Sequence, residues 1–250
     1  MGINSNISWC DHTWNIARGC NKIDEDCKYC YMYRESLDNT RYNPFKVIKT
    51  KTVFNFPLTI KEPSKIFTSS LTDVFHKDCD SFRGDMWDII RKCPHHTFQI
   101  LTKRPERIVA NTPADLLQAD NIWFGTSVGS EKGKHRIQEL IQIDCKTRFV
   151  SFEPLHERVD MNLDLLDLLK IHWAIIGGES GNDKGLYRYR PCEIEWMEEI
   201  ATAISGVGNA VFVKQMGTYL SKKLKMTDRH GTKLEEFPLS LQLREFPKAK

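Results

Sequence analysis

Residues 172–180 read HWAIIGGES: four consecutive apolar residues are followed by two glycines, Glu179 and Ser180. A short apolar run bounded by polar residues is typical of a strand that is buried on both faces. Similar runs recur along the chain, separated by segments with apolar residues three and four positions apart, as on one face of a helix. The expected strands are residues 13–20, 65–70, 97–102, 121–128, 147–154, 172–180 and 209–217, and the expected helices are residues 80–93, 134–143, 161–170 and 193–205.

The alternation of strand and helix predicts an α/β fold with a parallel sheet and helices outside it. Seven such units fit a parallel (β/α) barrel of the TIM type, either partial or full. An open doubly wound sheet is the competing architecture, because its periodicity is the same. We expect one barrel-like domain over residues 1–218 and a basic C-terminal extension over residues 219–250, which either contacts a phosphate backbone or is a solvated surface. Residues 219–233 of this extension carry the cations Lys222, Lys223, Lys225, Arg229 and Lys233.

The composition is that of an ordinary globular protein, since 40% of the 250 residues are hydrophobic and 28% are charged. The 36 Lys and Arg residues exceed the 33 Asp and Glu residues by only three, which is too small a bias to indicate a polyanionic partner by itself. No segment approaches the ~18 consecutive apolar residues of a membrane span. The first residues also lack the features of a secretory signal. We therefore expect a cytoplasmic protein with no membrane partner.

Polar side chains follow nearly every expected strand. Because the carboxyl ends of parallel strands meet at one face of the sheet, a mixed set of acids, bases and hydroxyls at these ends predicts a shared pocket. Solvation of the strand ends alone would explain one or two such residues. The residues that follow the strands are Ser69, Ser70, Asp73, His76, Lys103, Arg104, Ser127, Glu153, Glu179, Ser180, Lys214 and Gln215.

Three cysteines, Cys20, Cys27 and Cys30, lie within eleven residues near the amino end. Thiolates are soft ligands that suit zinc or iron–sulfur clusters. A zinc site would use Cys27 and Cys30 as one half and Cys20 with Cys10 or His12 as the other. A four-iron cluster held by three cysteines would instead leave one iron open. An open iron can chelate S-adenosylmethionine (SAM) and supply the electron that breaks its carbon–sulfur bond.

The spacing C-x6-C-x2-C, with Tyr29 before the last cysteine, resembles the radical SAM motif, which is usually C-x3-C-x2-C with an aromatic residue at that place. The chain has three extra residues between the first two cysteines. From Trp9 to Gly217 it also resembles the phage Gp37/Gp68 family. The stretches that carry this resemblance are TWNIARGC, CKYCY, FTSSLTDVFHKD, FQILTKRPERI, NIWFGTSV, RFVSFEPL, IIGGESG and VFVKQMG.

The resemblance implies a radical-SAM-like barrel with a [4Fe–4S] cluster and SAM as cofactors. The expected metal ligands are Cys20, Cys27 and Cys30. The expected cofactor contacts are Tyr29, Ser69, Ser70, Asp73 and Ser127. The expected catalytic residues at the substrate mouth are Glu153, Glu179 and Lys214. The expected substrate contacts are Lys103, Arg104 and Gln215.

Several of these roles have alternatives. In radical SAM enzymes a Gly-Gly-Glu segment after the second strand holds the amino group of the cofactor, whereas the segment that ends in Glu179 follows the sixth expected strand. Glu179 therefore either faces the ligand across the mouth or belongs to a tight turn. Lys103 and Arg104 either bind a carboxylate or phosphate or form a surface pair. Lys214 needs an acidic partner, Glu153 or Glu179.

These features predict a radical SAM enzyme that modifies or repairs a nucleic acid base or nucleotide, in a phage-related setting. Such an enzyme needs an external electron donor such as flavodoxin or ferredoxin. The alternative is a zinc-stabilised nucleic-acid-binding accessory protein without redox chemistry, in which Cys10 or His12 completes the metal site.

Overall fold

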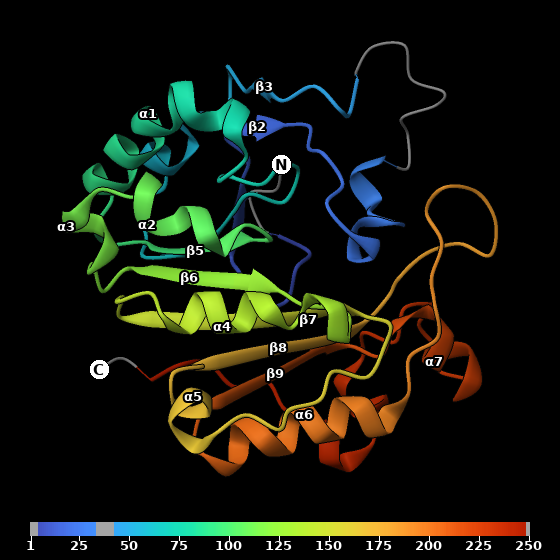
Figure 1. Cartoon of the computed structure of the whole chain (residues 1–250). Helices are drawn as coiled ribbons and strands as arrows, with labels where there is room; N and C mark the ends of the chain where they lie inside the picture. Colours follow the sequence, from blue (N-terminus) through green and yellow to red (C-terminus); the bar gives the residue numbers. More distant parts are fainter. Residues whose placement is uncertain (1–4, 34–42, 249–250) are drawn as a thin grey trace.

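The structure is a computed structural model that describes residues 5–33 and 43–248. Seven parallel strands form one sheet that curls into a half-barrel (Figure 1). Strand order in the sheet follows chain order, so every connection steps to the next strand, and a doubly wound arrangement is excluded. The predicted partial barrel is confirmed. Its strands are β1 (His12–Trp14), β4 (Lys65–Thr68), β5 (Thr97–Thr102), β6 (Ile122–Ser127), β7 (Thr147–Leu155), β8 (Trp173–Gly178) and β9 (Ala210–Gln215).

The strand expected at residues 13–20 is two strands. β1 ends at Trp14, and β2 (Ala17–Arg18) pairs antiparallel with β3 (Ile48–Lys49) in a separate small sheet. The chain leaves the main sheet at Asn15, whose side chain accepts a hydrogen bond from the backbone N–H of Leu71 at 2.7 Å. The single long strand that the sequence predicts is therefore wrong here, because side-chain bonds to the loop after β4 replace strand pairing.

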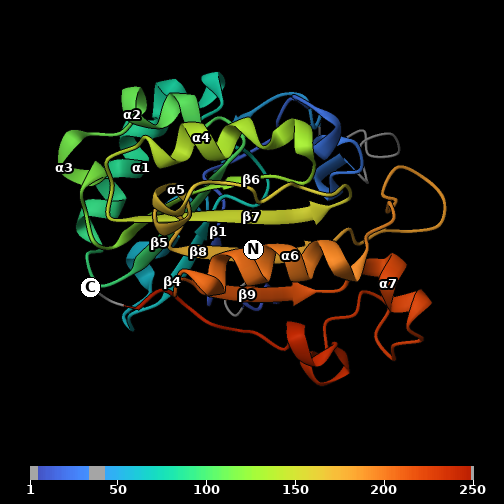
Figure 2. The ribbon, with the colours of Figure 1, turned by 60° about the horizontal axis from the view of Figure 1, so that its bottom comes forward.

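Four helices lie in the four segments predicted to be helical. They are α1 (Asp80–Lys92), α4 (His135–Ile141), α5 (Leu165–Leu169) and α6 (Ile194–Gly206). Three short helices were not predicted: α2 (Ile108–Asn111), α3 (Ala114–Leu117) and α7 (Gly217–Lys223). Helices α4 and α6 cover the outer face of the sheet over β6 to β9 (Figure 2). None of the helices in the described residues is both long and apolar enough to cross a bilayer.

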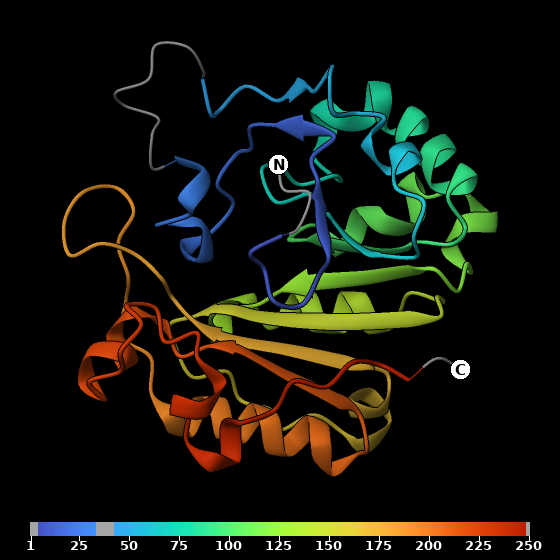
Figure 3. The same ribbon diagram turned by 180° about the vertical axis from the view of Figure 1, so that it is seen from behind.

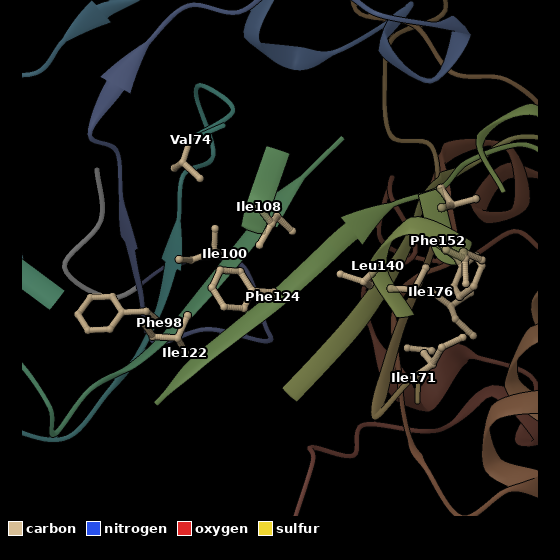
Figure 4. Close-up of a cluster of buried hydrophobic side chains, with 14 of the residues drawn as sticks. Val74, Phe98, Ile100, Ile108, Ile122, Phe124, Leu140, Phe152, Ile171 and Ile176 are labelled. Atoms are coloured by element: carbon tan, nitrogen blue, oxygen red, sulfur yellow. The ribbon is translucent and has the colours of Figure 1, made fainter. Parts of the chain in front are cut away.

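Side chains alternate between the two faces of each strand, which gives the protein two apolar layers. The larger layer lies between the sheet and the helices, and Figure 4 shows its members Phe98, Ile100 and Phe124 on neighbouring strands. The smaller layer fills the inside of the half-barrel, where the buried Trp173 ring lies 5.4–6.2 Å from the rings of five other aromatic residues. These five are Trp9, Trp123, Phe149, Phe212 and Phe246.

The segment after residue 218 packs on the same core. Leu220, Phe237 and Leu241 belong to the larger apolar layer, and Arg244 pairs with Phe212 of β9. Seen from behind, this segment runs along the edge of the sheet (Figure 3). The division into a barrel and a basic extension stays a prediction, although its boundary falls inside α7.

Gly125 on β6 gives a test of the inner layer. A Cβ atom at this position would lie 2.4 Å from Cζ of Phe149. We expect Gly125→Ala to lower the free energy of unfolding by about 1–3 kcal/mol, as measured in urea, because the ring must shift. The matched control is Gly84→Ala in α1, where no atom lies within 4 Å. The control should raise stability by about 0.5–1 kcal/mol. Equal stability of the two variants would contradict this packing.

Candidate functional site

A cavity of about 260 Å³ opens where the strands end and the cysteine loop, residues 20–33, covers them. The structure brings thirteen of the fourteen predicted site residues into its lining. The shared pocket expected from the strand ends is therefore present. Gln215 is the exception: its side-chain amide donates to the carbonyl of Gly178 at 2.9 Å instead. The predicted residues that line the cavity are Cys20, Cys27, Tyr29, Cys30, Ser69, Ser70, Asp73, Lys103, Arg104, Ser127, Glu153, Glu179 and Lys214.

The three clustered cysteines all line this cavity, and none is in a disulfide. The loop between them contains a short 3-10 helix (Glu25–Cys27), which Asp24 caps by accepting from the backbone N–H of Asp26 at 3.0 Å. Burial raises the pKa of the thiols of Cys20 and Cys30, so without a metal both are neutral at physiological pH.

The proposed fourth zinc ligands lie elsewhere. The buried Cys10 thiol donates to the hydroxyl of Ser5 at 3.4 Å, and His12 is the first residue of β1, at the amino end of the strand. Neither residue lines the cavity. In the part of the chain that the structure describes, no three His, Cys, Asp or Glu side chains are grouped to hold a metal ion. Cys20, Cys27 and Cys30 are among these described residues, so their thiols are arranged as neither a zinc site nor a cluster site, and the choice between the two stays a prediction.

Glu153 and Lys214 form an ion pair across the cavity mouth. The Lys214 ammonium donates to a Glu153 carboxylate oxygen at 2.5 Å, which confirms one of its two predicted partners. Gly177 on the neighbouring strand β8 leaves room for this carboxylate, since a Cβ atom there would lie 3.2 Å from its Cδ. This half-buried pair places a donor, the Lys214 ammonium, and an acceptor, the Glu153 carboxylate, beside any ligand in the cavity.

Glu179 is held by Arg190, a residue that the sequence reasoning missed. The Arg190 guanidinium donates to both carboxylate oxygens of Glu179, at 2.8 and 2.7 Å, and its backbone N–H donates to one of them at 2.8 Å. The same guanidinium donates to the carbonyl of Glu25 at 2.8 Å and lies 5.5 Å from the Tyr29 ring. The Glu179–Arg190 pair thus ties the loop after β8 to the cysteine loop.

Asp73 and Arg104, predicted to contact different ligands, bind each other. The Asp73 carboxylate accepts from Arg104 at 2.8 Å, from the Thr102 hydroxyl at 2.7 Å and from the backbone N–H of Lys103 at 3.0 Å. The Arg104 guanidinium also lies 4.0 Å from the sulfur of Cys20. With only 13% of its side chain exposed, Arg104 is not one of a pair of surface residues.

The three serine hydroxyls predicted to contact the cofactor have protein partners. Ser69 donates to the carbonyl of Trp14 at 3.1 Å, and Ser70 exchanges hydrogen bonds with the Asn15 side chain. Ser127 donates to the carbonyl of Glu153 at 2.9 Å and accepts from the Lys103 ammonium at 3.0 Å. Among the described residues Lys103 has no carboxylate partner, unlike the other cations that line the cavity.

The cysteine loop is anchored by the buried carboxylate of Asp26. It accepts from Gly129 N–H at 3.0 Å, from the Ser130 hydroxyl at 2.8 Å and from Arg136 at 2.5 Å, and it contacts His156 at 2.9 Å. Burial alone would raise the pKa of this carboxyl, but these four partners outweigh it and hold the pKa well below its ordinary value. Asp26 is therefore ionised at neutral pH.

A family model described as "Protein of unknown function (DUF5131)" matches residues 4–239. The chain belongs to this family. The name Gp37/Gp68 is not part of that description and stays a prediction. No curated protein matches the chain.

Two solved structures, both mutant forms of spore photoproduct lyase, are similar to this DUF5131 protein. They have 12% and 11% sequence identity and TM-scores of 0.49 and 0.48. The matches cover 83% and 80% of this chain and 77% and 75% of theirs. Values this low transfer no function to the DUF5131 chain.

The sequence of this DUF5131 protein did not reveal which residues anchor the cysteine loop. Arg136 and His156 sit in segments whose sequence carries no motif. One signal was present, however, because the three extra residues between Cys20 and Cys27 supply the loop that carries Asp26 to its partners. Arg190 had a weaker signal in the run YRYR, where basic and aromatic residues alternate.

Proposed function

We propose that this protein is a radical SAM enzyme of the cytoplasm that modifies or repairs a nucleic acid base or nucleotide, in a phage-related setting. The observation that carries this proposal is that three cysteines without disulfides line one cavity together with the polar strand ends, while both candidates for a fourth ligand lie outside it. Cys20, Cys27 and Cys30 would hold a [4Fe–4S] cluster, and the cavity would receive SAM. A reducing cytoplasm suits a protein whose described cysteines are all free.

The cluster, when bound, supplies the electron for reductive cleavage of SAM to a 5′-deoxyadenosyl radical. The chain's own residues would prepare the site for this chemistry. The buried Trp9 and Phe67 form part of the apolar cavity wall, which excludes water from a reactive species. Glu153 and Lys214 would orient polar groups of the ligands at the mouth, because each keeps a charged group beside the cavity.

A nucleotide substrate is supported by the charges around the cavity. Among the described residues the Lys103 ammonium donates to the Ser127 hydroxyl alone, so its remaining donors suit a phosphate or carboxylate. The loop after β8 adds the exposed Lys184 and Arg188 near Tyr187, which lines the cavity, whereas Glu179 already neutralises Arg190. Basic residues interleaved with aromatic ones are typical of surfaces that bind single-stranded nucleic acid.

Anaerobic purification tests this function. We expect a brown protein with about four irons per chain, which forms 5′-deoxyadenosine from SAM when reduced with dithionite. The Cys10→Ser variant should keep its iron, because this thiol lies outside the cavity. A colourless protein that holds one zinc per chain, and loses it in Cys10→Ser or His12→Ala, would overturn the proposal in favour of a zinc-stabilised nucleic-acid-binding protein.

A further inference from the structure

The outer side of the cysteine loop is covered by residues 43–48. The backbone N–H of Cys20 donates to the carbonyl of Pro44 at 2.9 Å. Gly19 has a φ of +105°, and a Cβ atom there would lie 2.2 Å from the carbonyl oxygen of Lys46. β2 and β3, which place Arg18 opposite Ile48, extend this contact (Figure 1). The surface over Cys20 is therefore built by two segments, residues 15–22 and 43–51.

All the charged residues in these two segments are basic. They contain five cations and no Asp or Glu. Among the described residues only Lys49 of these five forms an ion pair, with Asp85 at 2.5 Å. The five cations are Arg18, Lys22, Lys46, Lys49 and Lys51. Such a concentration of one sign contrasts with the net charge of +3 for the whole chain and creates a local positive potential.

Two exposed apolar side chains lie among these cations. Phe45 is 56% exposed and Ile48 is 47% exposed. The Phe45 ring lies 5.1 Å from the ring of Tyr33, and the hydroxyl of Tyr33 donates to the carbonyl of Cys20. The Tyr33 side chain therefore links the exposed Phe45 ring to the backbone of Cys20, one of the proposed cluster ligands. We name the surface formed by Arg18, Lys22, Phe45, Lys46 and Ile48 the hairpin patch.

We propose that the hairpin patch docks the acidic one-electron carrier protein that reduces the cluster. This inference rests on the proposed function, which requires an external reductant. The reduced flavin or iron–sulfur group of the carrier would give one electron to a cluster held by Cys20, Cys27 and Cys30, so the carrier would be oxidised by one electron and no atom would be transferred. The basic patch complements an acidic carrier, and the exposed apolar residues supply the dehydrated centre of an interface.

A protein fits this patch better than a nucleic acid does. Phe45 is the one aromatic side chain among the five patch residues, so the patch lacks the succession of aromatic faces on which neighbouring bases stack, and Ile48 offers neither a flat face nor a hydrogen bond. None of the five residues of the hairpin patch lines the cavity, whereas a base that is to react must enter it. The loop that carries Tyr187 and Arg188 lies on the cavity side instead.

Charge reversal on the patch tests the inference. The probe is a reduced acidic flavodoxin, with dithionite as a small reductant that needs no docking surface. The readings are the Kd of the flavodoxin, which each patch substitution should raise, and the rate of 5′-deoxyadenosine formation from SAM. We expect Arg18→Glu and Lys46→Glu each to slow the flavodoxin-driven rate about tenfold, because charge complementarity governs association. The dithionite-driven rate should stay within about twofold of wild type, since these side chains do not line the cavity.

Two further variants sharpen the result. Ile48→Ser removes apolar area without changing charge and should slow only the flavodoxin-driven rate. Lys61→Glu, an exposed position before β4, is the matched charge-reversal control and should change neither rate. Unchanged flavodoxin rates in both patch variants would overturn the inference, as would a loss of oligonucleotide binding with normal flavodoxin rates. If wild type cleaves no SAM even with dithionite, the proposed function fails instead.

Discussion

Replacing Arg136 with methionine is expected to lower the free energy of unfolding by about 3–5 kcal/mol, because it leaves a buried carboxylate without its cation. Only 1% of the Arg136 side chain is exposed, and its guanidinium donates to Asp26, itself 1% exposed, at 2.5 Å. It also donates to Asp24, the residue that caps the 3-10 helix ending at Cys27. One substitution would therefore release two anchors of the cysteine loop.

Arg158→Met is the matched control. Arg158 donates to Glu199 at 2.7 Å, but its side chain is 60% exposed, so water compensates both charges when the pair is broken. We expect a much smaller loss than in Arg136→Met, because exposed ion pairs contribute little to stability. Both variants are measured by urea unfolding at neutral pH under reducing conditions. Similar small losses in the two variants would show that the cysteine loop does not depend on the Asp26 network.

The same network has a pH signature. The pKa of Asp26 is lower in the folded protein than in the unfolded chain, where it is near its ordinary value of about 4. The ionised carboxylate therefore contributes stability above that value, and the contribution is lost as the pH falls towards the folded-state pKa. Asp26→Asn should lower stability at pH 7 and flatten its decline below about pH 4. An equally steep acid decline in wild type and variant would contradict this assignment.

The strands were predictable because a parallel strand that is buried on both faces is apolar at nearly every position. In β8, all six residues from Trp173 to Gly178 are buried, and the sequence shows this directly. The choice between a barrel and a doubly wound sheet was not predictable in the same way. It depends on the side of the sheet to which each crossover returns, and local periodicity does not record that side.

Short elements escaped prediction for a related reason. α2 and α3 have four residues each, which is about one turn, so no repeat of 3.6 residues can be recognised. α7 was hidden by its composition, because its last turn contains Lys222 and Lys223 while its first turn buries the small residues Gly217 and Thr218. A basic segment with one buried leucine resembles a solvated tail.

The sequence predicted which residues line the cavity but not which of them bind each other. Strand ends meet at one face by topology, so Ser127, Glu153 and Lys214 could be placed together without knowing any contact. Which acid takes which base depends on contacts across the chain. Asp26 is bound by groups 103 to 130 residues away, and no spacing in a single sequence encodes such a distance.

The largest effect on activity is expected from the cysteines. Under the proposed function, Cys30→Ala should reduce bound iron from about four atoms per chain to below one and abolish SAM cleavage, because two thiolates cannot hold a cluster that needs three. Cys30 and Cys27 belong to consecutive turns of one loop, and the backbone N–H of Cys30 donates to the carbonyl of Cys27 at 3.4 Å. Removing either thiol leaves the other without its partner.

Cys79→Ala is the control that separates ligation from a general need for thiols. Cys79 is fully buried outside the cavity, its thiol donates to the carbonyl of Asp73 at 3.7 Å, and burial raises its pKa to about 12. A buried thiol of this kind behaves as a small apolar residue, so its loss should cost about 1 kcal/mol of stability and no iron. Iron analysis and the visible spectrum measure both variants. Full iron retention in Cys30→Ala, or equal iron loss in Cys79→Ala, would mean that the cysteine loop is not the cluster-binding element and that the cavity serves a different chemistry.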